Sequence, residues 1–232
     1  MAPAIKLYTN HRCPWAHRAH IVLAELGLQY EEEIIDLDTP RTPAYLRVNP
    51  RGLVPSLSFD GEVITESAIV AQFLADTYPS TLVPSTADAG GPLTRARIAF
   101  FVDAWFSKVN GLYTKSLYAY SVEESETFAK DVVAAIIKEV EPLLANAGPF
   151  FGGSEKLTLA EALTGPFVLR LFTFAKHGLL PESLSKSLEQ SAPNFHKWGQ
   201  AVSQHPSVLS IFKEDVIVGT AQKRIAKIRG QT

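Results

Sequence analysis

The sequence predicts a small mixed α/β domain followed by an all-helical domain, and three features of the chain support this prediction. Short runs in which apolar and polar residues alternate occur within the first 79 residues. A stretch rich in Pro, Ser, Thr and Gly follows at residues 80–92, a composition typical of a linker. Beyond it, apolar residues recur at helical spacing and no hairpin pattern is evident. We therefore expect an α/β domain over residues 1–79, a linker over 80–92 and a helical domain over 93–232.

The first half of the α/β domain predicts a strand, a helix and a second strand. Residues 5–8 form a short apolar run, and apolar residues spaced for one helix face follow between Ala19 and Leu26. Gly27 stands where a glycine commonly ends a helix. Residues 30–37 are the candidate second strand. Because two strands joined by a helix need a crossover connection, we expect these strands to be parallel.

The second half of this domain predicts a hairpin and a closing helix. Residues 54–59 alternate apolar and polar side chains, Asp60-Gly61 follows, and residues 62–64 resume an extended pattern. Asp-Gly between two short apolar runs is a strong hairpin signal. The apolar residues between Ala68 and Leu74 then form one face of a helix that ends before Pro79.

Three apolar stripes at helical spacing predict the C-terminal domain. They run through residues 98–109, 132–144 and 159–175, and shorter helices are expected at 193–204 and 206–214. Thr158-Leu-Ala-Glu161 is a capping box that begins the third helix, because each side chain can accept from the other residue's amide. We interpret this box as structural. The residues from Ala162 to Pro166 predict a kink within that helix.

Composition and charge exclude several classes of protein. With 232 residues, 46% of them hydrophobic, the chain can bury a large core without crosslinks. The 22 Lys and Arg residues nearly balance the 24 Asp and Glu residues, and the formal charge of −2 argues against nucleic acid as a partner. No apolar run reaches the length of a membrane span, and the N-terminus lacks a leader pattern. We therefore expect a cytoplasmic protein that binds neither nucleic acid nor membranes.

The single cysteine, Cys13, is the first candidate for chemistry. It precedes Pro14, a residue favoured in the first turn of a helix, so its thiol is expected at a helix N-terminus. Unpaired amides and the positive end of the helix dipole favour the thiolate there, and Arg12 or His17 could add positive charge. The alternative is an ordinary buried cysteine. One cysteine also excludes an intrachain disulfide and any metal site built from cysteines alone.

Three histidines crowd around Cys13, namely His11, His17 and His20. A structural zinc site needs four converging ligands at characteristic spacings, and a helix that opens with Pro14 does not provide the loop of a metal knuckle. We therefore expect no metal here, and we interpret His17 and His20 as helix-surface or interface residues.

Two further motifs suggest a site for a peptide-like ligand. A proline at the start of a strand belongs at an edge or a bulge, and a cis Val54-Pro55 bond would turn the backbone of Val54 outward to pair with an extended ligand. A trans, purely structural proline is the alternative. Glu66-Ser67 opens the helix after the hairpin. Free amides and the Ser67 hydroxyl can bind a carboxylate there while Glu66 attracts an ammonium group, although the same pair would also serve as a simple N-cap.

Together these motifs resemble those of the cytosolic glutathione transferases. The resemblance rests on Cys-Pro-Trp-Ala at residues 13–16, Asn-Pro-Arg-Gly-Leu-Val-Pro-Ser-Leu at 49–57 and Glu-Ser-Ala-Ile at 66–69. It implies a thioredoxin-like N-terminal domain, an all-α C-terminal domain and glutathione as co-substrate. A cysteine at this position is similar to the omega class. The string Cys-Pro-Trp-Ala-His-Arg is also similar to the glutathionyl-hydroquinone reductases, whose chains are longer.

The resemblance assigns a role to each matching residue. Cys13 would be the catalytic thiolate. Val54 would pair through its backbone with the cysteinyl unit of glutathione, beside a cis Pro55. Glu66 and Ser67 would hold the γ-glutamyl end.

Two positions depart from the omega pattern. Val48 stands where that class has a Lys that contacts the glycyl carboxylate of glutathione. Arg51 or Arg47 is expected to take over this contact. Glu161 stands where the family more often has Asp, a change that the capping box tolerates.

The expected activity is glutathione-dependent thiol transfer and reductive deglutathionylation. Because Cys13 is the only cysteine, a second glutathione must free the enzyme in a monothiol, ping-pong cycle. Conventional conjugation of electrophiles is one alternative. A non-catalytic glutathione-binding regulatory module is the other, since a fold alone does not fix a function.

The second substrate is expected to be a small electrophilic or glutathionylated molecule bound between the two domains. Trp105, Tyr113 and Phe167 are candidate walls of its pocket, because such pockets are rich in aromatic residues and lie at domain interfaces. Core packing is the alternative for each of them. A homodimer is expected from the family resemblance.

Overall fold

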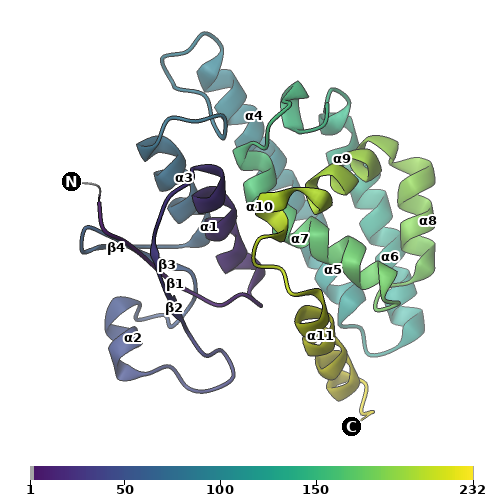
Figure 1. The fold of residues 1–232 in the computed structure, drawn as a ribbon. Helices are drawn as coiled ribbons and strands as arrows, with labels where there is room; N and C mark the ends of the chain where they lie inside the picture. Colours follow the sequence, from purple (N-terminus) through teal and green to yellow (C-terminus); the bar gives the residue numbers. More distant parts are fainter. Residues whose placement is uncertain (1–2, 232) are drawn as a thin grey trace.

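The computed structural model describes residues 3–231 and confirms an α/β domain followed by a helical domain (Figure 1). The elements of the first domain are β1 (Ile5–Thr9), α1 (Pro14–Glu25), β2 (Glu31–Ile34), α2 (Pro43–Val48), β3 (Ser56–Phe59), β4 (Glu62–Thr65) and α3 (Ser67–Thr77). Helix α2 is the element that the sequence analysis did not predict. It has only six residues, too few for a helical period to be visible.

The four strands form one mixed sheet in the order β2-β1-β3-β4. Strand β1 pairs with β2 in parallel, as the strand–helix–strand order predicted, and with β3 antiparallel. Strands β3 and β4 form the predicted hairpin, in which Asp60 and Gly61 have φ angles of 49° and 90°. Both residues occupy the left-handed region that tight two-residue hairpin turns require.

The second domain contains helical elements throughout. They are α4 (Gly91–Ala104), η1 (Trp105–Val109), α5 (Asn110–Leu117), α6 (Val122–Ala135), η2 (Ile136–Val140), η3 (Glu141–Leu144), η4 (Phe151–Gly153), α7 (Leu159–Lys176), α8 (Glu182–Ser191), α9 (Pro193–Gln204), α10 (Pro206–Leu209) and α11 (Glu214–Ile228). The three predicted stripes lie on α4–η1, α6–η2–η3 and α7. Helices α5, α8 and α11 were not predicted, and the helix expected at 206–214 ends at Leu209 as α10. Within residues 3–231, each helix is too short or too polar to cross a bilayer.

Helices α1 and α3 lie between the sheet and the helical domain, where both pack against α7 (Figure 1). Helix α7 continues through Pro166 and is buried along most of its length. Its predicted capping box is confirmed. The fully buried Glu161 carboxylate accepts hydrogen bonds from the amides of Thr158 (2.9 Å) and Phe151 (2.8 Å) and from the indole of Trp198 (2.7 Å). This one carboxylate therefore joins α7, η4 and α9.

Candidate active site

Cys13 is the N-cap residue of α1, and Pro14 opens the helix as the sequence predicted. The amide of Cys13 donates to the carbonyl of Asn10 (3.0 Å). Asn10 is itself fixed, because its side chain donates to the Ile35 carbonyl (2.9 Å). The Cys13 thiol is half-buried, and its sulfur lies 3.9 Å from the carbonyl oxygen of Val54. The loop after β1 thus holds the thiol at a helix N-terminus, opposite the Val54-Pro55 bond.

The Val54-Pro55 peptide bond is cis. A buried polar cluster holds the segment around it. The Asn49 amide nitrogen donates to the Leu53 carbonyl (2.9 Å) and to the Ser56 hydroxyl (3.1 Å), and the Tyr45 hydroxyl lies 3.1 Å from the same Ser56 hydroxyl. Because these partners fix the chain on both sides of Val54, its backbone groups have a defined position beside the thiol.

Glu66 and Ser67 form the start of α3. Glu66 has φ 69° and ψ 114°, a conformation that costs a non-glycine residue about 1–3 kcal/mol and is found mainly at functional sites. Ser67 is buried, and its hydroxyl accepts from Nη1 of Arg18 (3.0 Å). The exposed Glu66 carboxylate pairs with Arg51 (2.6 Å). The strained turn therefore presents a carboxylate, a hydroxyl and the first-turn amides of α3 together.

Five of the predicted site residues line one cavity of about 460 Å³, which we call the Cys13–Ser67 cavity. They are Cys13, Val54, Pro55, Glu66 and Ser67. The cavity brings together the thiol, the cis peptide and the strained turn, which are contributed by three separate segments of the α/β domain.

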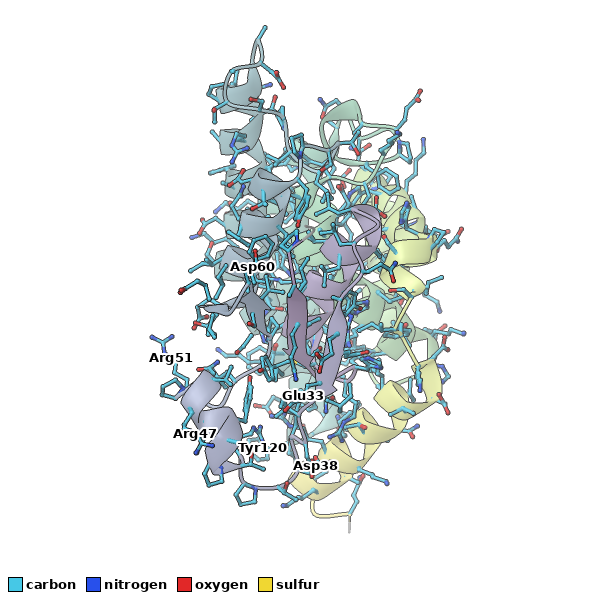
Figure 2. The ribbon with its side chains drawn as sticks, turned by 60° about the vertical axis from the view of Figure 1, so that its left-hand side comes forward. Glu33, Asp38, Arg47, Arg51, Asp60 and Tyr120 are labelled. Atoms are coloured by element: carbon cyan, nitrogen blue, oxygen red, sulfur yellow. The ribbon has the colours of Figure 1, made fainter. Side chains whose placement is uncertain are left out.

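The cation that lines this cavity near Asn49 and Leu53 is Arg41, which the sequence analysis missed. Its Nε donates to the Gly52 carbonyl (2.9 Å) and its Nη1 to the Thr39 carbonyl (2.8 Å). Arg47 and Arg51 are absent from the cavity lining. Figure 2 shows both at the side of the molecule where α2 lies. No local pattern marks Arg41, because it lies in the loop before α2.

A second cavity of about 460 Å³ also contains Cys13, and we call it the Cys13–Arg170 cavity. It lies between the loop at Cys13 and helices α5, α7 and α11. Tyr113 and Phe167, two of the three predicted walls, line it. Trp105 instead lies fully buried in the core, stacked on Phe195 at 5.9 Å, and lines neither cavity.

Two buried arginines lie beside Cys13. The guanidinium of Arg18 lies 4.5 Å from the Trp15 ring and 4.4 Å from the Phe106 ring, and it donates to the Leu163 carbonyl of α7 (2.8 Å). Burial lowers the pKa of Arg18 to about 9 and that of Arg170 to about 10, so both are charged at neutral pH. These two residues, which the sequence analysis did not select, therefore add buried positive charge near Cys13, whereas the predicted Arg12 pairs with Asp38 (2.7 Å).

Of the three histidines near Cys13, His17 and His20 are both buried rather than on the helix surface as predicted, and His11 lies beside His20. His17 is fully buried, and burial lowers its pKa well below the usual range, so it is neutral and adds no positive charge at Cys13. The ligand atoms of His11, His20 and Glu32 all lie within 4.8 Å of one another. Both ring nitrogens of His20 already have partners, the Thr9 hydroxyl (2.8 Å) and the Tyr30 hydroxyl (2.9 Å). This group therefore forms a satisfied hydrogen-bonded cluster, apart from both cavities.

Comparison with known proteins gives consistent matches. Residues 12–77 match the family described as "Glutathione S-transferase, N-terminal domain". The chain is 31% identical to glutathione S-transferase omega-1 of Rattus norvegicus, over 72% of this chain and 67% of that protein. It is 30% identical to maleylacetoacetate isomerase of Pseudomonas aeruginosa, over 64% of this chain and 73% of that protein. The crystal structure of glutathione transferase Omega 1C from Trametes versicolor matches with a TM-score of 0.79 and 25% identity, covering 97% of this chain and 98% of that one.

Proposed function

Because the chain belongs to the glutathione S-transferase family, we propose that it is a cysteine-type, omega-like transferase that uses Cys13 for glutathione-dependent thiol transfer and reductive deglutathionylation. The observation that carries this proposal is the position of the thiol. It lies at the N-terminus of α1 and opens on both cavities, one suited to glutathione and one to a second molecule. Unpaired first-turn amides and nearby cations stabilise a thiolate in such a position.

Glutathione is proposed to lie in the Cys13–Ser67 cavity. Its cysteinyl backbone pairs with Val54, and its γ-glutamyl group meets Glu66 and Ser67. Its glycyl carboxylate meets Arg41, which lines the other part of the cavity. A carboxylate and a helix N-terminus at one end, with a guanidinium at the other, match the charges along the tripeptide. Arg51 stays a predicted contact, made through its ion pair with Glu66.

The proposed reaction is a two-step thiol–disulfide exchange. The Cys13 thiolate attacks the glutathione sulfur of a mixed disulfide. The disulfide bond to the substrate breaks, and the substrate thiolate leaves with the electron pair and takes a proton from solvent. The thiolate of a second glutathione then attacks the glutathione sulfur bound to Cys13. Glutathione disulfide leaves and the Cys13 thiolate is regenerated. The second glutathione is required because the chain has one cysteine.

The decisive experiment compares wild-type protein with Cys13→Ser on the mixed disulfide of glutathione and 2-mercaptoethanol. We expect the variant to lose the reductase activity and to retain binding of S-hexylglutathione, which shows that the fold and the glutathione site are intact. Retained reductase activity in Cys13→Ser would refute the proposal.

Conjugation is the alternative function, and it calls for a different group at this position. A conjugating site donates a hydrogen bond to the thiolate of glutathione, whereas a cysteine competes with that thiolate as a nucleophile. Cys13→Ser is therefore expected to raise the conjugation of 1-chloro-2,4-dinitrobenzene. Binding of glutathione without turnover of either substrate by the wild type would instead indicate the regulatory module.

A homodimer in the cytoplasm is part of the proposal. Three large apolar side chains that are more than half exposed support it, namely Ile69 on α3 with Leu93 and Phe100 on α4. The ion pair between Asp76 and Arg95 places α3 beside α4, and apolar side chains exposed on adjacent helices are typical of protein interfaces. Light scattering during size-exclusion chromatography tests this, and a mass near the 25.4 kDa of one chain would contradict it.

A further inference from the structure

The Cys13–Arg170 cavity has more positive than negative charge on its walls. Its charged lining residues are Arg12, Asp38, Arg170 and Arg224. Arg12 pairs with Asp38 at 2.7 Å. Within the part of the chain that the structure describes, neither Arg170 nor Arg224 forms an ion pair with a carboxylate. Among the described residues, these two cations therefore line the cavity without a carboxylate partner.

Arg170 is the more unusual of the two because it is only 4% exposed. Its guanidinium donates to the carbonyls of Pro166 (2.8 Å) and Arg12 (3.3 Å) and lies 3.3 Å from Nδ1 of the neutral His17. Carbonyl dipoles offset only part of the cost of burying a cation, and buried charges normally have a partner of opposite sign. An anion that enters the cavity would supply this partner.

Arg224 and Tyr113 extend the positive region across the cavity. Arg224 comes from α11, and its guanidinium lies 4.1 Å from the ring of Tyr118. The Tyr113 hydroxyl has no hydrogen-bond partner among residues 3–231. Burial raises the pKa of Tyr113 well above the usual range, so the hydroxyl stays protonated and can donate. The cavity therefore offers two guanidinium groups and a free hydroxyl donor.

The remaining walls are apolar and aromatic. Trp15, Phe167 and Phe174 line the same cavity, and its volume of about 460 Å³ is within the usual range for small-molecule sites. These walls fit a planar aromatic group, and the cations fit a carboxylate attached to it.

We propose that the second substrate is an aromatic thiol that carries a carboxylate and is joined to the glutathione sulfur by a disulfide bond, and that Arg170 and Arg224 bind its carboxylate in the Cys13–Arg170 cavity. The inference rests on the proposed function, because this cavity receives the group that leaves the glutathione sulfur when Cys13 attacks. The Cys13 thiolate also lines this cavity, but it does not serve as the counter-charge of Arg170 in place of the substrate carboxylate. Arg18 lies beside the same thiol, and the negative charge on sulfur disappears when the mixed disulfide forms.

Two thioethers that cannot exchange test the charge preference by itself. S-(4-carboxybenzyl)glutathione and S-(4-carbamoylbenzyl)glutathione have nearly the same shape and differ by one charge. Titration calorimetry of the wild type should show the carboxylate binding about fivefold more tightly, a ratio expected for a partly desolvated charge pair. The preference should decrease at high salt, because added ions screen the carboxylate and leave the amide unaffected.

Substitutions assign the preference to the two cations. Arg224→Gln should reduce the preference for the carboxylate over the amide by about threefold, because the variant loses one exposed charge. Its affinity for the amide should stay unchanged. Lys223→Gln is the matched control, because Lys223 precedes Arg224 on α11 and does not line the cavity. Arg170→Gln should abolish the preference. If that variant fails to fold, Arg224→Gln decides the question on its own. Equal affinities in the wild type, or an undiminished preference in Arg224→Gln, would overturn the inference.

A turnover assay separates this inference from the proposed function. The wild type is assayed on the mixed disulfides of glutathione with 4-mercaptobenzoate and with 4-mercaptobenzamide, each corrected for its uncatalysed exchange. A binding preference for the carboxylate without turnover supports the anion site and refutes thiol transfer. Turnover of both disulfides without a binding preference refutes the anion site and supports thiol transfer.

Discussion

Replacement of Arg41 by glutamine tests how glutathione is oriented in the Cys13–Ser67 cavity. Nε and Nη1 of Arg41 donate to the backbone carbonyls of Gly52, Asp36 and Thr39. Nη2 has no partner within residues 3–231, and the side chain lines the cavity. We expect this free donor to bind the glycyl carboxylate.

The size of the effect follows from that one charge-assisted contact. Hydrogen bonds that involve a charged group contribute about 1.5–3 kcal/mol. Arg41 is partly exposed, so the lower end applies, and about 1.5 kcal/mol corresponds to roughly a tenfold change in affinity. Arg41→Gln also removes the bonds that hold its own loop. A loss of affinity by itself would therefore not identify the contact.

A thermodynamic cycle that combines Arg41→Gln with a modified ligand separates the loss of the charged contact from the change in the loop. Calorimetry compares glutathione with its glycyl amide, which lacks the carboxylate charge. The wild type should bind the amide roughly tenfold more weakly, the value of the charged contact. Arg41→Gln should bind the two ligands equally, whereas Arg47→Gln, an exposed control on α2, should behave as the wild type does. Equal weakening of both ligands by Arg41→Gln would refute the contact. Lost discrimination in Arg51→Gln would assign the contact to Arg51 instead.

Three further predictions concern stability and the nucleophile. Glu161→Gln should lower the free energy of unfolding by about 3 kcal/mol, because an amide cannot accept from all the buried donors that contact the carboxylate. Denaturant titration measures this loss. The control Glu124→Gln should lose much less, because the Glu124 carboxylate accepts from a single exposed amide. Burial lowers the pKa of His20 to about 3. The contribution of the neutral His20 to the free energy of unfolding is therefore complete above pH 6.5 and is lost as the pH falls towards 3. His20→Gln should therefore reduce the stability lost between pH 7 and pH 4.5 by about 2 kcal/mol, and an unchanged loss would contradict this. After incubation with glutathione disulfide, intact mass spectrometry should show one glutathione adduct on Cys13 well below pH 8. An ordinary free thiol reacts only near its pKa of about 8.5. An adduct that forms only at alkaline pH would indicate an inert cysteine.

The parts of the site that could be predicted from sequence are those specified by neighbouring residues. Cys13-Pro14 at a helix start, the Asp60-Gly61 turn and the Thr158–Glu161 capping box each depend on contacts within a few residues, so local patterns reveal them. The remaining site residues depend on contacts that no local pattern contains. Arg18 meets Leu163, which lies 145 positions further along the chain.

The missed helices illustrate two different reasons. Helix α11 has buried residues at Ile217, Val218, Ala221 and Ile225, a helical spacing that a longer search window would have detected. Helix α8 has only Leu184 and Leu188 in the core, so its apolar face consists of one pair of leucines four residues apart in an otherwise polar segment. Trp105 shows that a detected pattern can also be ambiguous, because an aromatic residue at helical spacing is compatible with a pocket wall or with the core. Its packing against Phe195 places it in the core.

Helix α7 connects the stability of the helical domain to the chemistry at Cys13. Glu161 anchors its first turn, the Leu163 carbonyl receives Arg18 of the α/β domain, and Arg170 donates to the carbonyl of Arg12 beside the thiol. Arg18 in turn donates to Ser67 in the first cavity. A displacement of the first turn of α7 would therefore move donors in both cavities at once, although Glu161 touches neither. The N-terminal motifs provide the nucleophile and the proposed glutathione contacts, but a buried helix without a catalytic motif determines where the guanidinium groups of Arg18 and Arg170 lie.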